Sequence, residues 1–318
     1  MRSVRLPTST AELDAAETAW WNEFSATCER LWTFDTHTAE AARGAYLEGG
    51  VRYLAGDGPG ERTVLDLGCG SGFTSRFLAG RGVRVVGVDV SPEQIRLARE
   101  QAAAGPAAAR DLMEFGVAST ADLEAAGERF DGVIGHAFLH HLAADELRDL
   151  LEEIGGLLRP GGRAWFLEPV FYPQGPPTPA ARLTKTGAFA CSVAQHVLRS
   201  AGQIDDGPLQ AAEGFFARAE REGWFLSPKE VPFAPAELEH VFAGGLRLES
   251  FAWVSTASYV TAQWVSLVRR PRLRRALAAT LLRAHAQADL ALGQTGGLGR
   301  LRGLEGYGFA ALACRNAR

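Results

Sequence analysis

The stretch Val64–Gly72, which reads VLDLGCGSG, carries the residues best suited to bind a ligand. Three glycines alternate with other residues directly after a run of Val and Leu, which is typical of a tight turn between a buried strand and a helix. A dinucleotide-binding loop would have its third glycine at the position of Phe73, and no Gly-Lys-Ser/Thr follows to make a P-loop. The spacing therefore disfavours both kinds of phosphate ligand.

Two carboxylates narrow the choice of ligand. Asp66 precedes the glycines at the end of the predicted first strand, where its charge would repel a pyrophosphate and attract an ammonium group. Asp89 ends the predicted second strand, where an acid can accept hydrogen bonds from both hydroxyls of a ribose. The residues thus predict a ligand with a ribose, a cationic amine and no phosphate, and S-adenosylmethionine fits.

A second group of residues is suited to proton transfer. His140 and His141 follow the predicted fourth strand, and Glu168 ends the fifth. Histidine is the natural base near neutral pH, and a base that takes the proton of an attacking hydroxyl contributes about 10²- to 10⁴-fold in rate. We expect one histidine to be that base, with Glu168 orienting it or contacting the acceptor. The alternative is that the histidines only cap the following helix.

Alternating strand and helix patterns must position these residues. Strands are predicted at residues 63–67, 84–89, 112–118, 131–135, 163–168, 246–254 and 307–315. Helices begin near Ser71, Ser91, Thr120 and Ala143. Such alternation predicts a parallel sheet covered on both faces, which binds its ligand beyond the carboxyl ends of the strands.

Four stretches resemble the successive motifs of the class I S-adenosylmethionine-dependent methyltransferases. They are VLDLGCGSG, VVGVDVS (85–91), FDGVIGHAFLHHL (130–142) and LLRPGGRAWFLEP (157–169). The resemblance covers residues 63–169 closely. It implies a Rossmann-like, doubly wound, mostly parallel sheet of seven strands whose last strand is antiparallel, with S-adenosylmethionine as cofactor and S-adenosylhomocysteine as its product.

The same resemblance implies roles for individual residues. The matching cofactor positions are Asp66, Gly68, Cys69, Gly70, Gly72, Asp89, Val90, Ala118, Ser119 and His136. The glycine turn resembles the one under the methionine moiety, with Asp66 holding the amine directly or through water. Asp89 resembles the acid that binds the ribose, and Val90 resembles the next residue, which packs against the adenine. His136 resembles a position whose backbone contacts the methionine end of the cofactor.

The sequence departs from the family pattern after the third strand. Many relatives have Gly-Asp-Ala there, with the acid near the adenine amine, whereas this chain reads Gly116-Val117-Ala118-Ser119. The contact with the adenine amine could instead come from one of four sources: Ser119, Thr120, the backbone alone, or Asp122 on a loop that folds back.

The chain divides into a core and helical additions. Residues 1–58 are predicted as an N-terminal helical cap, residues 59–168, 233–257 and 304–318 as the cofactor-binding core, and residues 169–232 and 258–303 as lid insertions. The segment WWNEF resembles N-terminal helices that close over the cofactor in quinone-type and natural-product methyltransferases. Aromatic residues in the insertions favour a bulky, apolar acceptor, although docking of the lid would also explain them.

Composition excludes other classes of function. The formal charge of −4 and the pI near 6.0 give no basic field for a nucleic-acid partner. The four cysteines make no metal-ligand spacing, so no metal site is expected. The N-terminus lacks the apolar core of a signal peptide, and no segment has the pattern of a membrane span, so a cytoplasmic protein is expected. A homodimer is possible.

These observations predict methyl transfer to a fairly bulky, largely apolar small molecule of secondary metabolism, with oxygen as the favoured acceptor atom. Methyl transfer to carbon or nitrogen, and use of the cofactor without methyl transfer, are the alternatives.

Overall fold

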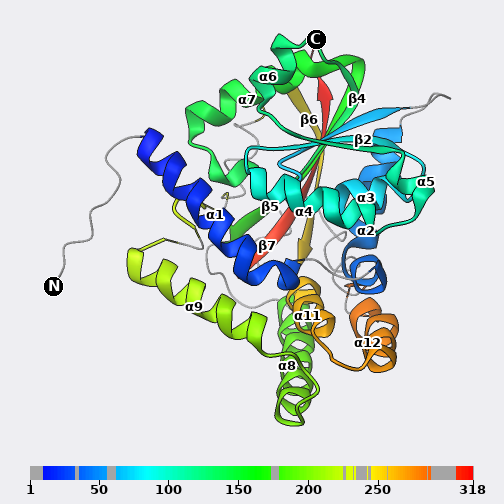
Figure 1. Ribbon diagram of the computed structural model, residues 1–318, viewed down its shortest axis with the longest axis vertical. Coiled ribbons are helices and arrows are strands. Elements are labelled where there is room, and N and C mark those ends of the chain that lie inside the picture. Colours follow the sequence, from blue (N-terminus) through cyan, green and yellow to red (C-terminus); the bar gives the residue numbers. More distant parts are fainter. Residues whose placement is uncertain are drawn as a thin grey trace.

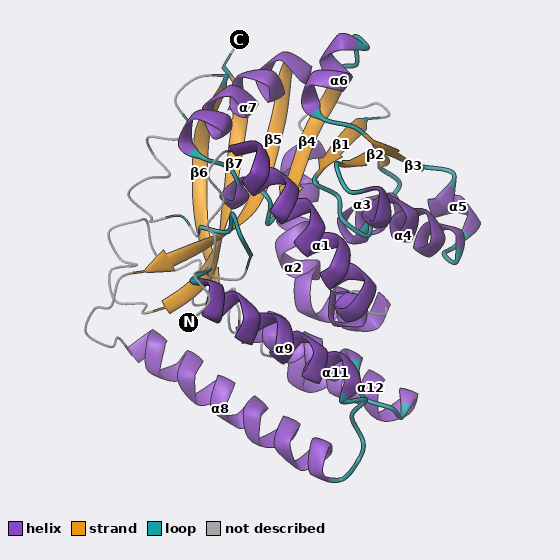
Figure 2. Ribbon diagram, turned by 60° about the vertical axis from the view of Figure 1, so that its left-hand side comes forward, coloured by secondary structure: helices purple, strands orange, loops and turns teal. Residues whose placement is uncertain are grey.

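The computed structural model describes residues 10–32, 36–55, 62–172, 179–224, 227–231, 233, 242, 245–255, 257–284, 286–287 and 306–317. Its sheet contains β1 (Thr63–Leu67), β2 (Arg84–Asp89), β3 (Met113–Val117), β4 (Phe130–His136), β5 (Leu158–Tyr172), β6 (Leu246–Ser255) and β7 (Gly306–Asn316). The strand order is β3-β2-β1-β4-β5-β7-β6, and β7 runs antiparallel to both neighbours, whereas β1 to β5 are parallel. Figure 1 shows the sheet between its helices, and all seven strands can be followed by their labels in Figure 2. The predicted seven-stranded fold with an antiparallel last strand is confirmed.

Both faces of the sheet are covered because successive side chains of a strand point to opposite sides. On one face Val64 packs in a cluster with Leu54 and Leu78. On the other face Leu65 packs in a cluster with Leu151 and Ile154. The helices concerned are α2 (Thr36–Ala55) and α3 (Phe73–Ala79) on the first face, and α6 (Thr120–Ala125) and α7 (Ala144–Leu157) on the second.

The helix starts follow local signals, with one correction. Helix α4 (Pro92–Ala103) begins as predicted, with Pro92 at its first position and Oγ of Ser91 accepting a hydrogen bond from the Gln94 N–H at 3.3 Å. Helix α3 was expected near Ser71 but begins at Phe73. The reason is that the glycines before it have left-handed backbone angles, which a helix cannot contain.

Strand β5 is longer than the predicted 163–168. It continues to Tyr172, and residues 169–172 pair with residues 306–309 of β7. Pro169 fits in this strand because it lies beyond the last pair of β4 and β5, His136 with Leu167, so its missing N–H is not needed for that ladder. Its carbonyl accepts a hydrogen bond from the Phe233 N–H at 3.2 Å on the same edge. The chain therefore leaves the sheet later than the expected insertion boundary at residue 169.

The helices outside the sheet gather beyond one end of it. They are α1 (Thr10–Trp32), α8 (Pro179–Ser200), α9 (Gly207–Glu222), α11 (Ala257–Ser266) and α12 (Pro271–Leu277), which runs into a π turn at Ala278–Leu282. Figure 2 shows α8, α9, α11 and α12 together below the strands. The buried residues of these added helices form one cluster that includes Trp20, Phe215 and Trp264. The two insertions thus pack together, and their role as a roof over the acceptor stays a prediction. The helix expected from Pro235 lies outside the described residues.

Candidate active site

The glycine turn after β1 depends on glycine at three positions. Gly68, Gly70 and Gly72 have φ values of 66°, 52° and 75°, a region that other residues rarely adopt. A Cβ on Gly72 would lie 3.0 Å from the Phe115 ring, and one on Gly68 would lie 3.0 Å from Phe138. A Cβ on Gly70 would meet only a Gln94 oxygen at 3.7 Å. Gly70 is therefore the point of the turn that a ligand can approach.

Asp89 connects this turn to the end of β2. Its Oδ2 accepts a hydrogen bond from the Gly70 N–H at 3.0 Å, and its Oδ1 accepts one from the Ser91 N–H at 2.8 Å. Burial raises the pKa of Asp89, although these two bonds oppose the rise. Each carboxylate oxygen keeps a further lone pair, so the pair can also accept the two hydroxyls of a ribose.

Asp66 lies deeper than Asp89. It is fully buried at the end of β1 and accepts a hydrogen bond of 2.6 Å from the Ser75 hydroxyl in α3. Burial raises its pKa to about 7, and the hydrogen bond from Ser75 only partly opposes this. Its predicted contact with an amine is not tested by this geometry. The neighbouring Cys69 is buried, which raises the pKa of its thiol, so that only its backbone is suited to a ligand contact.

Two exposed valines lie beside Asp89. Val90 is 64% exposed and Val117 is 52% exposed, and Val117 pairs with Asp89 across β2 and β3. Their exposure suits them to cover the flat face of an adenine. Val117 was missed from the sequence because the third strand of this chain does not end in the family's usual acid.

The segment after Val117 is a helix start. The Ser119 hydroxyl accepts a hydrogen bond from the Asp122 N–H at 3.2 Å and donates one to the Asp122 carboxylate at 2.7 Å, which makes a capping box. Asp122 is therefore engaged with Ser119 at the first turn of α6. The Ala118 N–H donates to the carbonyl of Asp89 at 3.3 Å. Ala118 and Ser119 thus lie close to Asp89, whereas the carboxylate of Asp122 is bound to Ser119.

The histidine pair follows the end of β4. His136 is the last residue of that strand, and Ala137 has a φ of 58°, an uncommon angle for a residue other than glycine. The short 3₁₀ helix Leu139–His141 comes next. This sharp turn projects both imidazoles beyond the carboxyl end of β4.

Glu168 of β5 holds that turn. Its Oε1 accepts hydrogen bonds from the N–H groups of Phe138 and Leu139, each at 3.2 Å, and its Oε2 lies 2.9 Å from Nδ1 of His140. Glu168 is completely buried. The predicted proximity of Glu168 to a histidine is therefore found, and its full burial favours an orienting role over contact with an acceptor.

His140 is held between two acids. Nδ1 faces Glu168, and Nε2 lies 3.6 Å from Oε1 of Glu230, a residue in the segment after α9. Burial opposes a charge on His140, but its contacts with Glu168 and Glu230 outweigh this and raise its pKa to about 9. At neutral pH His140 is therefore a cation, which cannot accept a proton.

His141 has a different surrounding. Nδ1 lies 2.8 Å from Oε1 of Glu17 in α1, without the alignment of a hydrogen bond. The Trp21 ring stands edge-on to it at 5.6 Å, and the two histidine rings are 4.0 Å apart. The His141 side chain keeps 16% exposure, against 3% for His140. Of the two histidines, His141 is therefore the one that an acceptor can reach.

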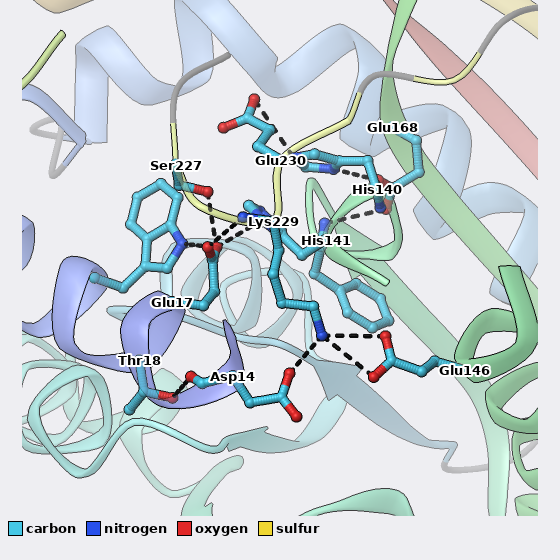
Figure 3. Close-up of polar contacts among 12 residues, drawn as sticks. Asp14, Glu17, Thr18, His140, His141, Glu146, Glu168, Ser227, Lys229 and Glu230 are labelled. Carbon is cyan, nitrogen blue, oxygen red and sulfur yellow. Dashed lines mark hydrogen bonds and ion pairs between the residues drawn. The ribbon is translucent and has the colours of Figure 1, made fainter. Parts of the chain in front are cut away.

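The acids that surround the pair come from distant segments (Figure 3). Glu17 also contacts Ser227 and Lys229, and Lys229 bridges to Asp14 and Glu146 through its ammonium group. Sequence reasoning missed Glu17, Ser227, Lys229 and Glu230. The only sequence signal was that Glu17 lies one helical turn before Trp21, and nothing local connects either residue to the histidines.

Among the described residues, His140, His141 and Glu230 form the group with ligand atoms close enough for a metal ion, all within 4.8 Å of one another. Metal ligation needs a neutral imidazole with a free lone pair. His140 faces a carboxylate with each ring nitrogen and is cationic at neutral pH. The contacts of these three residues therefore favour a hydrogen-bonded network over a metal site.

The aromatic residues expected at the acceptor divide into two sets. Phe215 and Trp264 are buried in the core of the helical cluster, and Trp20 packs edge-on against Phe215 and Trp224 at 5.2 and 5.4 Å. These residues dock the helices to one another, which was the alternative interpretation. The structure does not describe the other side chains of this kind, which are Phe171, Tyr172, Phe189, Phe225 and Tyr259.

Comparison with known proteins agrees with this fold. Residues 64–162 match the family described as "Methyltransferase domain". A ubiquinone biosynthesis O-methyltransferase from Mesorhizobium japonicum is 33% identical over 99 residues, which is 31% of this chain and 37% of that protein. An arsenite methyltransferase from Halobacterium salinarum is 37% identical over 142 residues, 42% of this chain and 34% of that protein. The chain thus matches these curated relatives over about a third of their own length.

Solved structures match over almost the whole chain. The cyclopropane synthase MmaA2 from Mycobacterium tuberculosis aligns with a TM-score of 0.56 and 15% identity, covering 96% of this chain and 98% of that one. A geranyl diphosphate C-methyltransferase from Streptomyces coelicolor aligns with a TM-score of 0.51 and 15% identity, covering 98% and 100%. Residues 64–162 therefore form a methyltransferase domain, and the chain as a whole has the Rossmann-like fold of these two solved structures. No helix in the described part of the chain has the length and apolar character to span a membrane.

Proposed function

We propose that the protein transfers the methyl group of S-adenosylmethionine to a hydroxyl oxygen of a fairly bulky, largely apolar small molecule. The observation that carries the choice of oxygen is the histidine pair beyond β4, in which each ring faces a buried carboxylate. A hydroxyl acceptor must lose a proton, and such a pair is suited to take it. The similarity to a ubiquinone biosynthesis O-methyltransferase supports the same choice.

The cofactor would lie across the glycine turn. Asp89 would accept the ribose hydroxyls, Val90 and Val117 would cover the adenine, and the turn from Gly68 to Gly72 would pass under the methionine moiety. The remaining proposed contacts are Asp66 at the amine, the Cys69 backbone, Ala118, Ser119 and the His136 backbone. The open space over Gly70 and the two exposed valines support this placement.

The reaction requires the protein to align the acceptor oxygen with the methyl group. In methyl transfer from a sulfonium the positive charge on sulfur disappears, so the attacking oxygen must be held in line with the methyl group in a dry site. His141 would take the hydroxyl proton as the oxygen attacks. The fixed positive charge of His140, 4.0 Å from His141 between ring centres, would favour the developing alkoxide.

Methyl transfer to carbon is the second candidate. Addition of a methyl cation to an alkene leaves a carbocation, which nearby carboxylates would stabilise and which would lose a proton to one of them to restore the double bond. Three buried acids, Glu17, Glu168 and Glu230, surround the two imidazoles, and this excess of acids is the observation that favours it. Transfer to nitrogen, and use of the cofactor without transfer, have no such support. The small-molecule acceptor of secondary metabolism and the cytoplasmic location remain parts of the proposal.

A turnover assay tests the proposal. Purified protein is incubated with S-adenosylmethionine and matched acceptors that carry a phenol, a methyl ether in its place, or an isolated alkene, and S-adenosylhomocysteine is quantified with the methylated product. Product from the phenol alone supports transfer to oxygen. Product from the alkene with none from the phenol would replace it with transfer to carbon.

A further inference from the structure

The carboxylate of Glu17 is a fixed point between three segments of the chain (Figure 3). Its Oε1 accepts hydrogen bonds from Nε1 of Trp21 at 2.6 Å and from the Ser227 hydroxyl at 2.8 Å. Its Oε2 accepts one from the Lys229 N–H at 2.8 Å. With these donors on both oxygens, the carboxylate has no freedom to turn, and its Oε1 is held against His141 at 2.8 Å.

Glu17 is ionised in this position. Burial opposes its charge, but the contacts with His141, Lys229 and Ser227 outweigh burial and hold the pKa of Glu17 below its ordinary value. An ionised carboxylate only accepts hydrogen bonds. A lone pair on Nδ1 of His141 would be repelled by the ionised oxygen 2.8 Å away, so a neutral His141 ring is favoured with its hydrogen on the nitrogen that faces Glu17.

We propose that Glu17 is the positioning residue of the acceptor base: it selects the form of His141 with the hydrogen on Nδ1, so that Nε2 keeps the lone pair that takes the acceptor's proton. The proton step rests on the proposed function, whereas the selected form of His141 does not. Glu168, which the sequence suggested for this role, serves His140 instead.

The contrast with His140 explains why the two adjacent histidines have different tasks. His140 faces a carboxylate with each ring nitrogen and is held as a cation. Among the described residues, the ion-pair contact of His141 is with Glu17. One carboxylate on one nitrogen orients a neutral ring and leaves the other nitrogen available. The Glu17 contact is short but not aligned, which is common at catalytic contacts before the substrate binds.

The same helix also contacts the cofactor end. Asn22, little more than one turn after Glu17 in α1, accepts a hydrogen bond of 2.5 Å from the Ser91 hydroxyl. The Ser91 N–H in turn donates to Asp89. The helix that carries Glu17 is therefore connected through Ser91 to Asp89 at the end of β2.

The direct test is the ring-nitrogen NMR spectrum of His141 in ¹⁵N-histidine-labelled protein with S-adenosylhomocysteine bound. The assignment comes from the loss of one signal pair in His141→Gln. In the wild type we expect the neutral ring to carry its hydrogen on Nδ1. A neutral wild-type ring with its hydrogen on Nε2 would overturn the proposal, and this measurement needs no Glu17 variant to fold.

A variant pair extends the test to the reaction. Glu17→Ala should shift the neutral His141 ring toward the Nε2–H form and lower turnover of a hydroxyl acceptor about 10²-fold, with affinity for S-adenosylmethionine within twofold of wild type. Glu23→Ala is the matched control, because Glu23 lies in the same helix, is exposed and pairs with Arg218 at 3.0 Å. If Glu17→Ala keeps the wild-type ring form and turnover, the proposal is wrong. If the wild type turns over no hydroxyl acceptor, the proposed function fails, and the ring form still decides the role of Glu17.

Discussion

Two regions of this molecule are built in different ways: the proposed cofactor end, at the glycine turn and Asp89, and the proposed acceptor end, at the two histidines after β4. The proposed cofactor residues come from one stretch, residues 66–136, and the main connection among them is the hydrogen bond from the Gly70 N–H to Asp89. The acceptor end combines Glu17 from α1, the histidines after β4, Glu168 from β5 and Glu230 from the segment after α9. The first needs only neighbouring strands in register, whereas the second needs helices from distant parts of the chain to dock.

The difference teaches where each substitution should act. A change at the cofactor end should alter ligand affinity or the shape of one turn. A change at the acceptor end should alter proton transfer and its dependence on pH, because buried acids and imidazoles are coupled there.

The largest effect is expected from His141→Ala. Loss of the base should lower turnover of a hydroxyl acceptor about 10²- to 10⁴-fold and leave the dissociation constant of S-adenosylmethionine nearly unchanged, since the residue acts on the acceptor. Single-turnover rates and calorimetry measure the two quantities. His196→Ala on the exposed face of α8 is the control. Equal loss of cofactor affinity and turnover would break the division into two ends.

A buried acid at the cofactor end should limit stability at intermediate pH. The pKa of Asp66 is raised by burial to about 7 from 3.8, so the stability it contributes is present below about pH 4 and is lost as the pH rises through 7. Asp66→Asn removes that loss and should raise the free energy of unfolding at pH 8 by up to about 4 kcal/mol. Urea titrations at pH 5 and pH 8 without cofactor measure it. No gain at pH 8 relative to pH 5 would contradict the expectation.

His140 should produce a second pH window at the acceptor end. Its pKa is raised to about 9 from 6.5, so its stabilisation is complete below pH 6.5 and is lost as the pH rises through 9. The free energy of unfolding should fall by about 3 kcal/mol over that window in the wild type, and by much less in His140→Gln. Denaturation at pH 6, 7.5 and 9.5 tests this. Parallel curves for the two proteins would show that His140 is not held as a cation.

Asp89→Ala should act on affinity alone. An unpaired ribose should weaken S-adenosylmethionine binding by about 1 to 3 kcal/mol, with turnover at saturating cofactor close to wild type. Calorimetry measures the affinity of each variant for S-adenosylmethionine. The control is Asp111→Ala, because Asp111 is an exposed acid after α5 (Ala107–Arg110). An unchanged affinity would place the ribose elsewhere.

The smallest effect distinguishes two glycines of one turn. Both Gly70→Ala and Gly72→Ala carry the strain of a positive φ, but the new Cβ at residue 72 would lie 3.0 Å from Phe115 and 3.1 Å from Ala98. Gly72→Ala should therefore lose about 1 kcal/mol more stability than Gly70→Ala, and Gly70→Ala should lose more cofactor affinity. Equal losses of stability in the two variants would show that Phe115 moves aside at little cost in free energy.

The sheet and the cofactor end could be predicted because their signals are local. Runs of Val and Leu end at Leu67 and Asp89, where the strands end, and the Ser-Pro pair at residues 91–92 begins α4. Parallel strands bring their carboxyl ends to one edge whatever the rest of the chain does. The positions of Asp66, Asp89 and the glycine turn follow from that rule, while their contacts with the cofactor stay predictions.

The length of β5 and the acceptor end could not be predicted in this way. Residues 169–172 extend the strand because β7 lies beside them, which no pattern in Pro169–Tyr172 reveals. For Trp20 the sequence favours helix packing over substrate contact, and for Phe215 it leaves a substrate pocket and docking of the lid open. Their contact in the folded protein, with ring centroids 5.2 Å apart, decides for packing.

By itself, then, the sequence determined the class of fold, the glycine turn and the presence of two histidines at the end of the fourth strand, because each depends on residues within one strand–turn–helix unit. The tertiary structure decided which acid serves which histidine. Glu168 could face either ring from β5, and its bonds to the turn at residues 138–140 assign it to His140. Glu17 reaches His141 only through the docking of α1 against segments far along the chain, and the charge of a buried group depends on every partner brought within a few ångströms of it.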